Sequence, residues 1–341
     1  MRKYNVAVVG ATGVVGREIL KILDERKFPL GELKLLASKR SAGMRTSFQH
    51  KEYIINETTP DSFEKVEFAL FASSEAASDV FASEAVKRGA VVIDNSSTFR
   101  MNPEVPLIVP EVNPEDISWH KGIIANPNCS TIQLVVVLKP LHDAARIKRI
   151  VVSTYQSVSG WGREAMEELQ HQTRDIIAGS IPSVRKEILP HQIAFNLIPQ
   201  IDKFLEDGYT KEEMKMVNET KKIMKDDTIK VTATCVRVPV MVSHSEAVNI
   251  ELEKPLSAKE ARAILAKAPG VEVIDSPADL LYPMPAMAAG KDASYVGRIR
   301  EDKTVPNGLN LWVVSDNLRK GAALNAVQIA ELFVKRDNNK K

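Results

Sequence analysis

Short runs of apolar residues alternate with amphipathic segments through the first third of the chain. The apolar runs predict strands at Tyr4–Val9, Leu33–Ala37, Val66–Phe71, Val91–Asp94, Leu107–Val109 and Gly122–Ala125. Between them, apolar residues recur at helical spacing and predict helices at Val14–Arg26, Ala76–Arg88 and Ile132–Ala145. Strands that alternate with helices of this length are typical of βαβ units. We therefore expect an α/β protein that begins with a Rossmann-type domain built on a parallel sheet.

The pattern changes near Lys148, where longer segments rich in β-branched residues begin. They predict strands at Arg149–Gln156, Lys230–Val240, Ala247–Leu252, Val271–Asp275, Ser294–Glu301 and Leu309–Ser315. A polar stretch from Arg163 to Asp227 separates the first two and is predicted to be mostly helical. This order favours an α+β second domain with a mostly antiparallel sheet. Gly321–Lys335 predicts a final amphipathic helix that returns to the first domain.

Length and composition are those of a two-domain globular protein. The chain has 341 residues, of which 44% are hydrophobic and 26% charged, and a domain usually holds about 150 residues. We expect a nucleotide-binding domain over residues 1–127 together with 319–341, and a catalytic and dimerisation domain over 128–318. The formal net charge of +2 gives no strong field that would favour nucleic acid or a membrane as a partner.

Targeting and metal-binding signals are weak. No apolar stretch approaches the roughly 18 residues that span a bilayer, and the first residues lead into a strand rather than a signal peptide. Cys129 and Cys235 are too far apart in the sequence for a zinc pattern or a disulfide framework. We expect a cytoplasmic protein with reduced thiols and no bound metal.

A glycine-rich turn joins the first predicted strand to the first predicted helix. Its spacing is G-x-x-G-x-x-G rather than the commoner G-x-G-x-x-G. Glycines in such a turn let the backbone approach a pyrophosphate, which the helix N-terminus then faces. The flanking strand and helix favour a dinucleotide site over a ligand-free turn. The residues assigned to this site are Gly10, Thr12, Gly13, Val14 and Val15.

The end of the second predicted strand indicates which dinucleotide binds. An acidic residue there would hold the ribose 2′-hydroxyl of NAD, but the sequence reads Ala37-Ser38-Lys39-Arg40-Ser41. A guanidinium can instead clamp a 2′-phosphate. We predict NADP as the cofactor, with Ser38 and Arg40 at that phosphate. The alternative is a solvated basic turn.

Cys129 stands where a nucleophile would be well placed. It follows the turn-forming Asn126-Pro127-Asn128 and precedes the apolar run Ile132–Leu138, which predicts a helix. Free N–H groups and the positive end of the dipole at a helix N-terminus favour a thiolate over a thiol, and the thiolate is the reactive form. A buried structural cysteine after a turn is the alternative.

His244 lies in the predicted link between two strands of the second domain. A neutral imidazole near pH 7 can accept a proton from a hydroxyl group. Thiolate attack on an aldehyde, hydride transfer to a nicotinamide and cleavage of the resulting thioester would unite Cys129, His244 and the cofactor in one reaction. Taken alone, such a histidine is more often a structural residue.

Several segments together resemble the aspartate-β-semialdehyde dehydrogenase family over nearly the full length of the chain. They are Gly10–Gly16, Ala37–Gly43, Asp94–Arg100, Val109–Asn113, Asn126–Thr131, Tyr155–Gly160, Arg237–Pro239 and His244. The resemblance implies NADPH-dependent reduction of L-aspartyl-4-phosphate to L-aspartate 4-semialdehyde through a cysteine thioester. That aldehyde is the branch point toward methionine, threonine, isoleucine and, through diaminopimelate, lysine. It also implies a homodimer or homotetramer that binds this small substrate and phosphate.

The resemblance implies the catalytic roles. Cys129 matches the family's nucleophile, and Gln156 matches the glutamine that orients the thioester. His244, seven residues after Arg237, matches the acid/base. Arg237 matches the arginine that binds substrate, and its planar fork suits an α-carboxylate.

The resemblance also implies further binding residues. Glu219 fits a glutamate that pairs with the substrate's amino group, and Arg100, Asn128 and Lys222 resemble a phosphate-binding set. Because Glu219 and Lys222 are three residues apart, both would reach one helix face; the alternative is a surface ion pair. The remaining cofactor contacts are assigned to Ser73, Gly160 and Asn317.

Two other functions fit parts of the pattern. N-acetyl-γ-glutamyl-phosphate reductases perform the same chemistry on a longer, acylated substrate, but their cysteine usually follows Asn-Pro-Gly, whereas here it follows Asn-Pro-Asn. A non-catalytic paralogue is the second alternative, and the presence of Cys129, Gln156, Arg237 and His244 argues against it.

Overall fold

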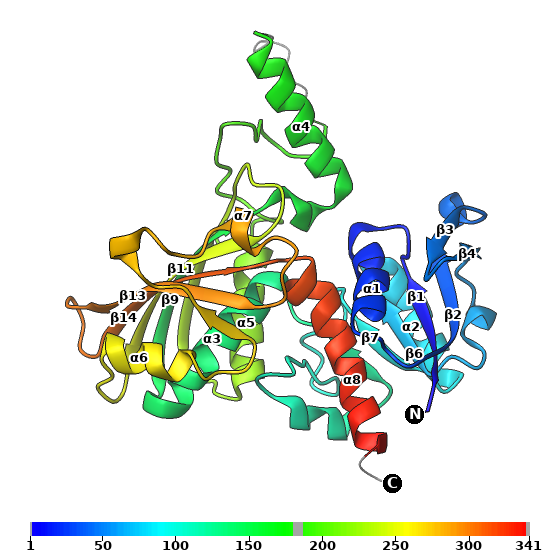
Figure 1. The fold of residues 1–341 in the computed structure, drawn as a ribbon, viewed down its shortest axis with the longest axis horizontal. Coiled ribbons are helices and arrows are strands. Elements are labelled where there is room, and N and C mark those ends of the chain that lie inside the picture. Colours follow the sequence, from blue (N-terminus) through cyan, green and yellow to red (C-terminus); the bar gives the residue numbers. More distant parts are fainter. Residues whose placement is uncertain (1, 180–186, 339–341) are drawn as a thin grey trace. The chain divides into compact units, whose positions relative to one another are not determined.

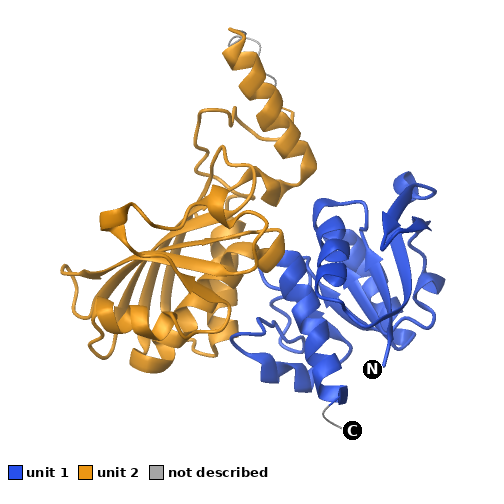
Figure 2. Ribbon diagram, in the orientation of Figure 1, with its two compact units in different colours: residues 1–128, 322–341 blue, residues 129–321 orange. Residues whose placement is uncertain are grey.

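The chain forms two compact units (Figures 1 and 2). The computed structural model describes residues 2–179 and 187–338. Unit 1 comprises residues 1–128 and 322–341, and unit 2 comprises residues 129–321. The boundaries predicted from the sequence, at 127/128 and 318/319, lie beside these positions.

Unit 1 is built on a parallel sheet with the strand order β5-β2-β1-β6-β7-β8. Its strands are β1 (Tyr4–Val9), β2 (Leu30–Ala37), β5 (Asn56–Glu57), β6 (Phe68–Phe71), β7 (Val91–Asp94) and β8 (Ile123–Ala125). Every neighbouring pair runs parallel. The order reverses between β1 and β6, as in doubly wound nucleotide-binding domains. This confirms the expected fold class.

Helices cover both faces of this sheet. Ile19 and Leu23 of α1 (Val14–Glu25) and Val327 of α8 (Leu324–Asn338) share a core with one face. Ala82 and Ala85 of α2 (Glu75–Lys87) share the other core with the opposite face. Because buried parallel strands need apolar cover on both sides, the returning C-terminal helix completes the layer beside α1 (Figure 1).

Three features of unit 1 differ from the prediction, the first of which is the short edge strand β5, which was not predicted. Leu107–Val109 is not a strand: only Leu107 forms an isolated bridge, to Ala125 at the end of β8. A hairpin of β3 (Arg45–Phe48) and β4 (Lys51–Ile54) was not predicted, because its residues are mostly exposed and lack a regular apolar alternation.

Unit 2 contains a mixed sheet with the strand order β10-β9-β11-β14-β13-β12. Its strands are β9 (Ile147–Gln156), β10 (Lys230–Arg237), β11 (His244–Leu252), β12 (Val271–Val273), β13 (Ser294–Asp302) and β14 (Gly308–Ser315). The three inner pairings are antiparallel, and the two outer ones, β10 with β9 and β12 with β13, are parallel. The expected second domain is confirmed, with more parallel pairing than predicted.

Three helices pack on one another and on this sheet. They are α3 (Cys129–Ala145), α5 (Lys211–Met224) and α6 (Ala258–Leu265). Two further helices belong to unit 2 (Figure 1). Helix α7 (Pro285–Ala288) packs against β14, and α4 (Arg163–Ile177) packs against the short helical turn Val158–Trp161. Part of the predicted helical stretch, residues 180–186, lies outside the described residues.

Three elements in unit 2 begin or end at other residues than predicted. In each case a candidate site residue is the first or last residue of the element. Helix α3 begins at Cys129 rather than at Ile132. Strand β10 ends at Arg237, because Pro239 has no N–H to continue the ladder. His244 is the first residue of β11 rather than part of the link before it.

In the described ranges 2–179 and 187–338, every helix is too short or too polar to cross a membrane.

Candidate active site

Three strand ends in unit 2 bring Arg237, Gln156 and His244 together. Arg237 ends β10 and pairs in register with Gln156, which ends β9. Strand β11 runs antiparallel to β9, with Ser245 opposite Tyr155. Its first residue, His244, therefore lies beside the end of β9. All three side chains are buried, with at most 3% of their surface exposed, so whatever binds here meets desolvated polar groups.

The His244 ring is held in one tautomer. Its Nδ1 accepts a hydrogen bond of 3.0 Å from the Ser157 backbone N–H, so the neutral ring carries its proton on Nε2. No group among the described residues is bonded to that Nε2. Burial, and then the nearby charge of Arg237, lower the pKa of His244 well below 6.5. At neutral pH the ring therefore offers an N–H, whereas the sequence suggested a proton acceptor.

Arg237 lies directly beside this histidine. Its Nη1 donates to the Ser157 carbonyl oxygen at 2.7 Å. A Cβ atom at Gly160 would lie 3.0 Å from that Nη1 and 3.3 Å from the His244 Nε2. Gly160 thus leaves room in front of both groups. Burial lowers the pKa of Arg237, and the charges of Glu212 and Cys129 oppose that shift.

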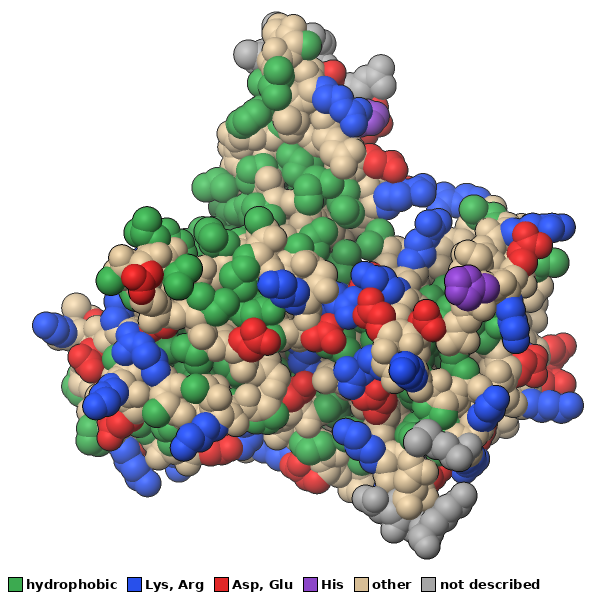
Figure 3. Space-filling model, in the orientation of Figure 1, with side chains coloured by type: hydrophobic (Ala, Val, Ile, Leu, Met, Phe, Trp, Pro, Cys, Tyr) green, Lys and Arg blue, Asp and Glu red, His purple; other side chains and the backbone are tan. Residues whose placement is uncertain are grey.

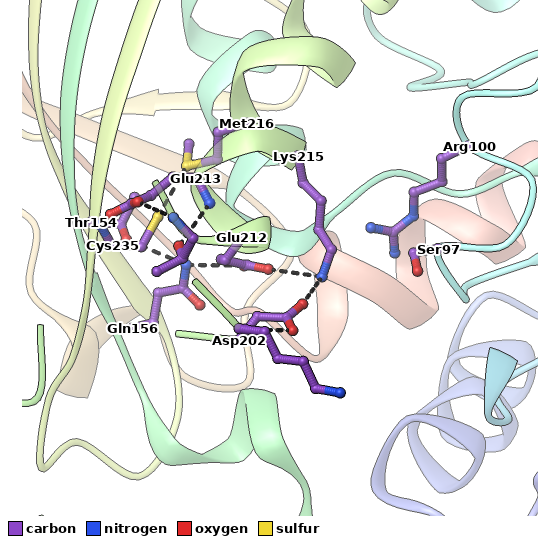
Figure 4. Close-up of polar contacts among 12 residues, drawn as sticks. Ser97, Arg100, Thr154, Gln156, Asp202, Glu212, Glu213, Lys215, Met216 and Cys235 are labelled. Carbon is purple, nitrogen blue, oxygen red and sulfur yellow. Dashed lines mark hydrogen bonds and ion pairs between the residues drawn. The ribbon is translucent and has the colours of Figure 1, made fainter. Parts of the chain in front are cut away.

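Gln156 begins a chain of polar contacts that leads onto helix α5 (Figure 4). Its Nε2 donates to Glu212 Oε1 at 3.2 Å and to the Thr154 hydroxyl at 3.3 Å. The other oxygen of Glu212 accepts a hydrogen bond of 3.2 Å from Lys215 Nζ. Lys215 also pairs with Asp202 Oδ2 at 2.9 Å. A carboxylate and an ammonium group thus stand next to the Gln156 amide.

These contacts place a different glutamate and lysine beside Gln156 than the pair predicted from the sequence, Glu219 and Lys222. The Glu-x-x-Lys pattern occurs twice in α5, at 212–215 and at 219–222. Seven residues are two helical turns, or about 10 Å along the axis. The pair beside Gln156 is Glu212 and Lys215. Glu219 is buried and Lys222 half-buried, two turns further along the helix.

Cys129 occupies the first position of helix α3, which has 17 residues. Its side chain is partly exposed. A Cβ atom at Gly321 would lie 3.0 Å from the Cys129 Cβ, so a glycine is needed for the close approach of that segment. The thiol therefore sits at the N–H end of a helix dipole, the setting that favours a thiolate.

The second cysteine is inert. Cys235 is fully buried on β10, and its Sγ lies 3.9 Å from the Met216 sulfur. Burial raises the pKa of the Cys235 thiol far above its usual range. This cysteine packs the interior of unit 2.

Asn317 organises the loops around His244. Its Oδ1 accepts hydrogen bonds from the hydroxyls of Ser157 and Ser159 at 3.1 Å and from the Ser243 backbone N–H at 2.9 Å. Ser157 binds the histidine ring, and Ser243 precedes it in the chain. With its oxygen occupied in this way, Asn317 acts as a positioning residue for His244.

In unit 1, the turn after β1 requires glycine. Gly10 has φ +83°, and a Cβ atom there would lie 2.2 Å from the Ala72 carbonyl oxygen. A Cβ atom at Gly16 would lie equally close to the Gly10 carbonyl oxygen. The other residues assigned to this turn are Thr12, Gly13, Val14 and Val15; Gly13 is exposed and the rest are half-buried.

The surroundings of this turn fit the phosphates of a dinucleotide. Within the described chain, no side chain caps α1 and its first turn holds no acidic residue, so no side chain of that turn competes with an anion for its N–H groups. Ser73 follows β6 at the point where strand order reverses, and its buried hydroxyl has no bonded partner among the described residues. Ser38 and Arg40 are exposed just beyond β2.

Arg100 supports the segment that leads to the cysteine. The Arg100 side chain is buried, and it donates to the carbonyl oxygens of Asn126 at 3.0 Å and Asn95 at 2.8 Å. Asn128, two residues after Asn126, is buried as well. Arg100 therefore holds the backbone two residues before Asn128.

Glu246 is a buried acid that sequence reasoning did not single out. It lies two residues after His244 on β11 and is fully buried. Burial raises the pKa of Glu246 well above 4.5, and the nearby Gln133 amide offsets only part of that rise. The folded protein therefore binds a proton that the unfolded chain releases near its ordinary pKa, and stability falls as pH rises through this window.

We expect Glu246→Gln to be more stable than the wild type at pH 8, with a smaller difference at pH 5. The wild-type penalty grows by about 1.4 kcal/mol for each pH unit between the two pKa values. Thermal unfolding of both proteins at the two pH values measures this. An equal difference at pH 5 and pH 8 would contradict a buried neutral carboxyl group.

Comparison with known proteins places both units in one family. The family model for the semialdehyde dehydrogenase NAD-binding domain matches residues 5–120, and that for the semialdehyde dehydrogenase dimerisation domain matches residues 138–320. The aspartate-semialdehyde dehydrogenase of Aquifex aeolicus is 57% identical over 97% of this chain and 98% of its own.

Solved structures agree with this. Aspartate-semialdehyde dehydrogenase II of Vibrio cholerae, complexed with ASA, has a TM-score of 0.94 and 48% identity over 98% of this chain and 99% of its own. The Candida albicans enzyme with NADP has a TM-score of 0.76 and 25% identity, over 97% and 98% of the two chains. The chain belongs to the aspartate-semialdehyde dehydrogenase family.

Proposed function

We propose that this enzyme reduces L-aspartyl-4-phosphate to L-aspartate 4-semialdehyde with NADPH, releasing phosphate, by way of a thioester on Cys129. The observation that carries the proposal is the buried group formed by Arg237, Gln156 and His244 in the unit whose first helix begins with Cys129. An apolar or purely structural site would not leave three such polar side chains at neighbouring strand ends.

The reaction follows from these groups. The Cys129 thiolate attacks the substrate's C4 carbonyl and phosphate leaves, which forms the thioester. NADPH, when bound, supplies the hydride that reduces the thioester. The His244 Nε2–H donates a hydrogen bond to the oxygen of the resulting hemithioacetal, and Gln156 holds the carbonyl in place. Breaking the carbon–sulfur bond releases the aldehyde and restores the thiolate.

Substrate recognition uses charges that are already in place. The Arg237 fork binds the α-carboxylate. Glu212, held by Gln156 and Lys215, binds the α-ammonium group, and Lys215 binds the phosphate. This replaces the assignment of Glu219 and Lys222 with the pair that contacts Gln156. Arg100 and Asn128 of unit 1 stay candidates for phosphate binding.

We expect Glu212→Gln to raise the KM for the aldehyde at least about ten-fold, because a buried partner of the ammonium loses its charge. Glu219→Gln, two turns away on the same helix, should change this KM less than about three-fold. Initial rates over a range of aldehyde concentrations measure both. A larger effect at position 219 would restore the pair predicted from the sequence.

NADP rather than NAD is proposed from the basic turn after β2. Ser38 and Arg40 are exposed there, and no acid follows the strand. We expect Arg40→Ala to weaken NADPH binding about ten-fold or more, with little change for NADH, because the guanidinium meets only the 2′-phosphate. Fluorescence titration of each cofactor measures this, and an unchanged NADPH-to-NADH ratio would contradict it.

We propose that the chain forms a homodimer through unit 2, the part matched by the dimerisation-domain model. Unit 2 carries large apolar side chains in exposed positions, and Figure 3 shows apolar groups gathered over α7 and the base of α4. The large exposed apolar side chains of unit 2 include Ile177, Phe195, Leu197, Phe204, Leu280 and Leu281. Light scattering over a range of concentrations distinguishes a dimer from a tetramer or a monomer.

Substrate choice is tested by phosphate-dependent reduction of NADP with two aldehydes. L-aspartate 4-semialdehyde alone should give a signal, and that signal should vanish when phosphate is omitted. A signal with N-acetyl-L-glutamate 5-semialdehyde alone would instead identify an N-acetyl-γ-glutamyl-phosphate reductase. Silence with both, in folded protein that binds NADP, would identify a non-catalytic paralogue.

A further inference from the structure

Lys215 lies between two carboxylates in unit 2 (Figure 4). Its Nζ is 2.9 Å from Asp202 Oδ2 and 3.2 Å from Glu212 Oε2. The two acids differ in their surroundings: 6% of the Glu212 side chain is exposed, against 30% of that of Asp202. Glu212 also accepts a hydrogen bond from Gln156 in the proposed site. Asp202 instead lies in the loop that precedes α5 and contacts the lysine from there.

That loop is tied to the start of α5. The Lys211 N–H donates to the Lys203 carbonyl oxygen at 2.9 Å, and Phe204 and Thr210 form a β-bridge. Asp202 has φ +67°, in the left-handed region that Asp tolerates better than most residues, and its Oδ1 accepts the Lys203 N–H at 2.8 Å. These contacts hold the Asp202 carboxylate in place beside Lys215.

Asp202 is ionised at neutral pH. Burial opposes its ionisation, but hydrogen bonds from Lys215 and from the Lys203 N–H hold the pKa of Asp202 below its ordinary value. Lys215 therefore lies between two acidic side chains, and Lys211 also lies close enough to lower the pKa of Asp202. An oxyanion that approaches Lys215 must displace one of the two acids, and the half-exposed Asp202 is easier to displace than the buried Glu212.

We propose that Asp202 is an internal competitor for Lys215 that weakens phosphate binding at the proposed active site. This inference rests on the proposed role of Lys215 in binding the phosphate. In the resting enzyme Lys215 pairs with Asp202. When phosphate or the phosphoryl group of the substrate binds, the lysine transfers to it, and when phosphate leaves, Asp202 recovers the lysine. Because the Asp202 carboxylate competes for Lys215, the lysine binds phosphate less tightly, and the phosphate released in the reaction leaves more readily.

Asp202→Asn tests this, because the amide keeps the size and an acceptor oxygen but removes the competing charge. We expect the KM for phosphate, measured with saturating aldehyde and NADP, to fall about two- to five-fold, the upper part of the range of a partly exposed ion pair. The KM for the aldehyde should change less than about two-fold. Calorimetric titration of the enzyme with inorganic phosphate alone should show the same gain without any catalysis.

Glu206→Gln is the matched control. Glu206 is an exposed acid on the same loop, so its loss changes the net charge equally and should leave the phosphate KM unaltered. In a Lys215→Met background, Asp202→Asn should no longer improve phosphate binding. A phosphate KM that rises or stays constant in Asp202→Asn would overturn the proposal. A wild-type reaction that ignores phosphate would instead refute the proposed function itself.

Discussion

Cys129→Ser is expected to reduce the rate of phosphate-dependent NADP reduction by on the order of a thousand-fold or more. The hydroxyl is barely ionised at neutral pH, and the helix N-terminus that favours a thiolate cannot make an alkoxide. Without the nucleophile no thioester forms, so neither hydride transfer nor phosphorolysis can follow. Initial rates with purified, folded protein measure the loss, and NADP binding should be unchanged because the glycine turn lies in the other unit.

Cys235→Ala provides the control for this experiment. Cys235 is buried beside Met216 and its thiol is held protonated by burial. Its replacement should lower the unfolding temperature but leave most of the turnover rate. Iodoacetamide should label the peptide that contains Cys129 and spare the one that contains Cys235. Activity that survives in Cys129→Ser, or is lost only in Cys235→Ala, would contradict the proposed nucleophile.

The sequence pattern predicted the layers of the fold well where strands are buried on both faces. The strands β1, β6 and β7 are nearly continuous apolar runs because helices cover both sides of the sheet. The same signal failed for Leu107–Val109, which is equally apolar but contributes only a single bridge. An apolar run shows that a segment is buried, and whether it pairs as a strand depends on a neighbour that the sequence does not specify.

In the candidate site, too, local sequence motifs indicate some residues, whereas others depend on how helices and strands pack. Cys129, Gln156, Arg237 and His244 were assigned because the motifs around them resemble those of one family. The same resemblance did not single out Glu212, because the pattern Glu-x-x-Lys recurs after two helical turns. Both copies face the same side of α5, and only the packing of that helix against the end of β9 selects the first.

The sequence could not predict which ring nitrogen of His244 carries the proton. A motif identifies a histidine but does not say which ring nitrogen faces the substrate. Here a backbone N–H from Ser157, itself fixed by the Asn317 network, occupies Nδ1. The choice of tautomer therefore depends on loops from three separate stretches of the chain.

His244→Ala is expected to lower kcat by about 10²- to 10⁴-fold, since the site loses the group that stabilises the hemithioacetal oxygen. The kcat of His244→Gln should be at least about ten-fold higher than that of His244→Ala, because the glutamine amide can present an N–H to the same oxygen. Comparison of kcat for the two variants at fixed pH measures the recovery. His191→Gln, at an exposed position of the same unit, should behave as the wild type.

The pH dependence separates hydrogen-bond donation from proton exchange. Burial and Arg237 lower the pKa of His244 well below 6.5, so the ring stays neutral from pH 8 down through its ordinary pKa and becomes charged only in more acidic solution. If His244 acts only as a neutral hydrogen-bond donor, it should cause no change in the wild-type kcat between pH 8 and pH 6.5. A kcat profile with a His244-dependent step near pH 6.5, together with a glutamine variant as inactive as alanine, would show that the ring exchanges a proton instead. The Ser157 contact would then have to break in each cycle, because Nδ1 cannot hold a proton while it accepts that N–H.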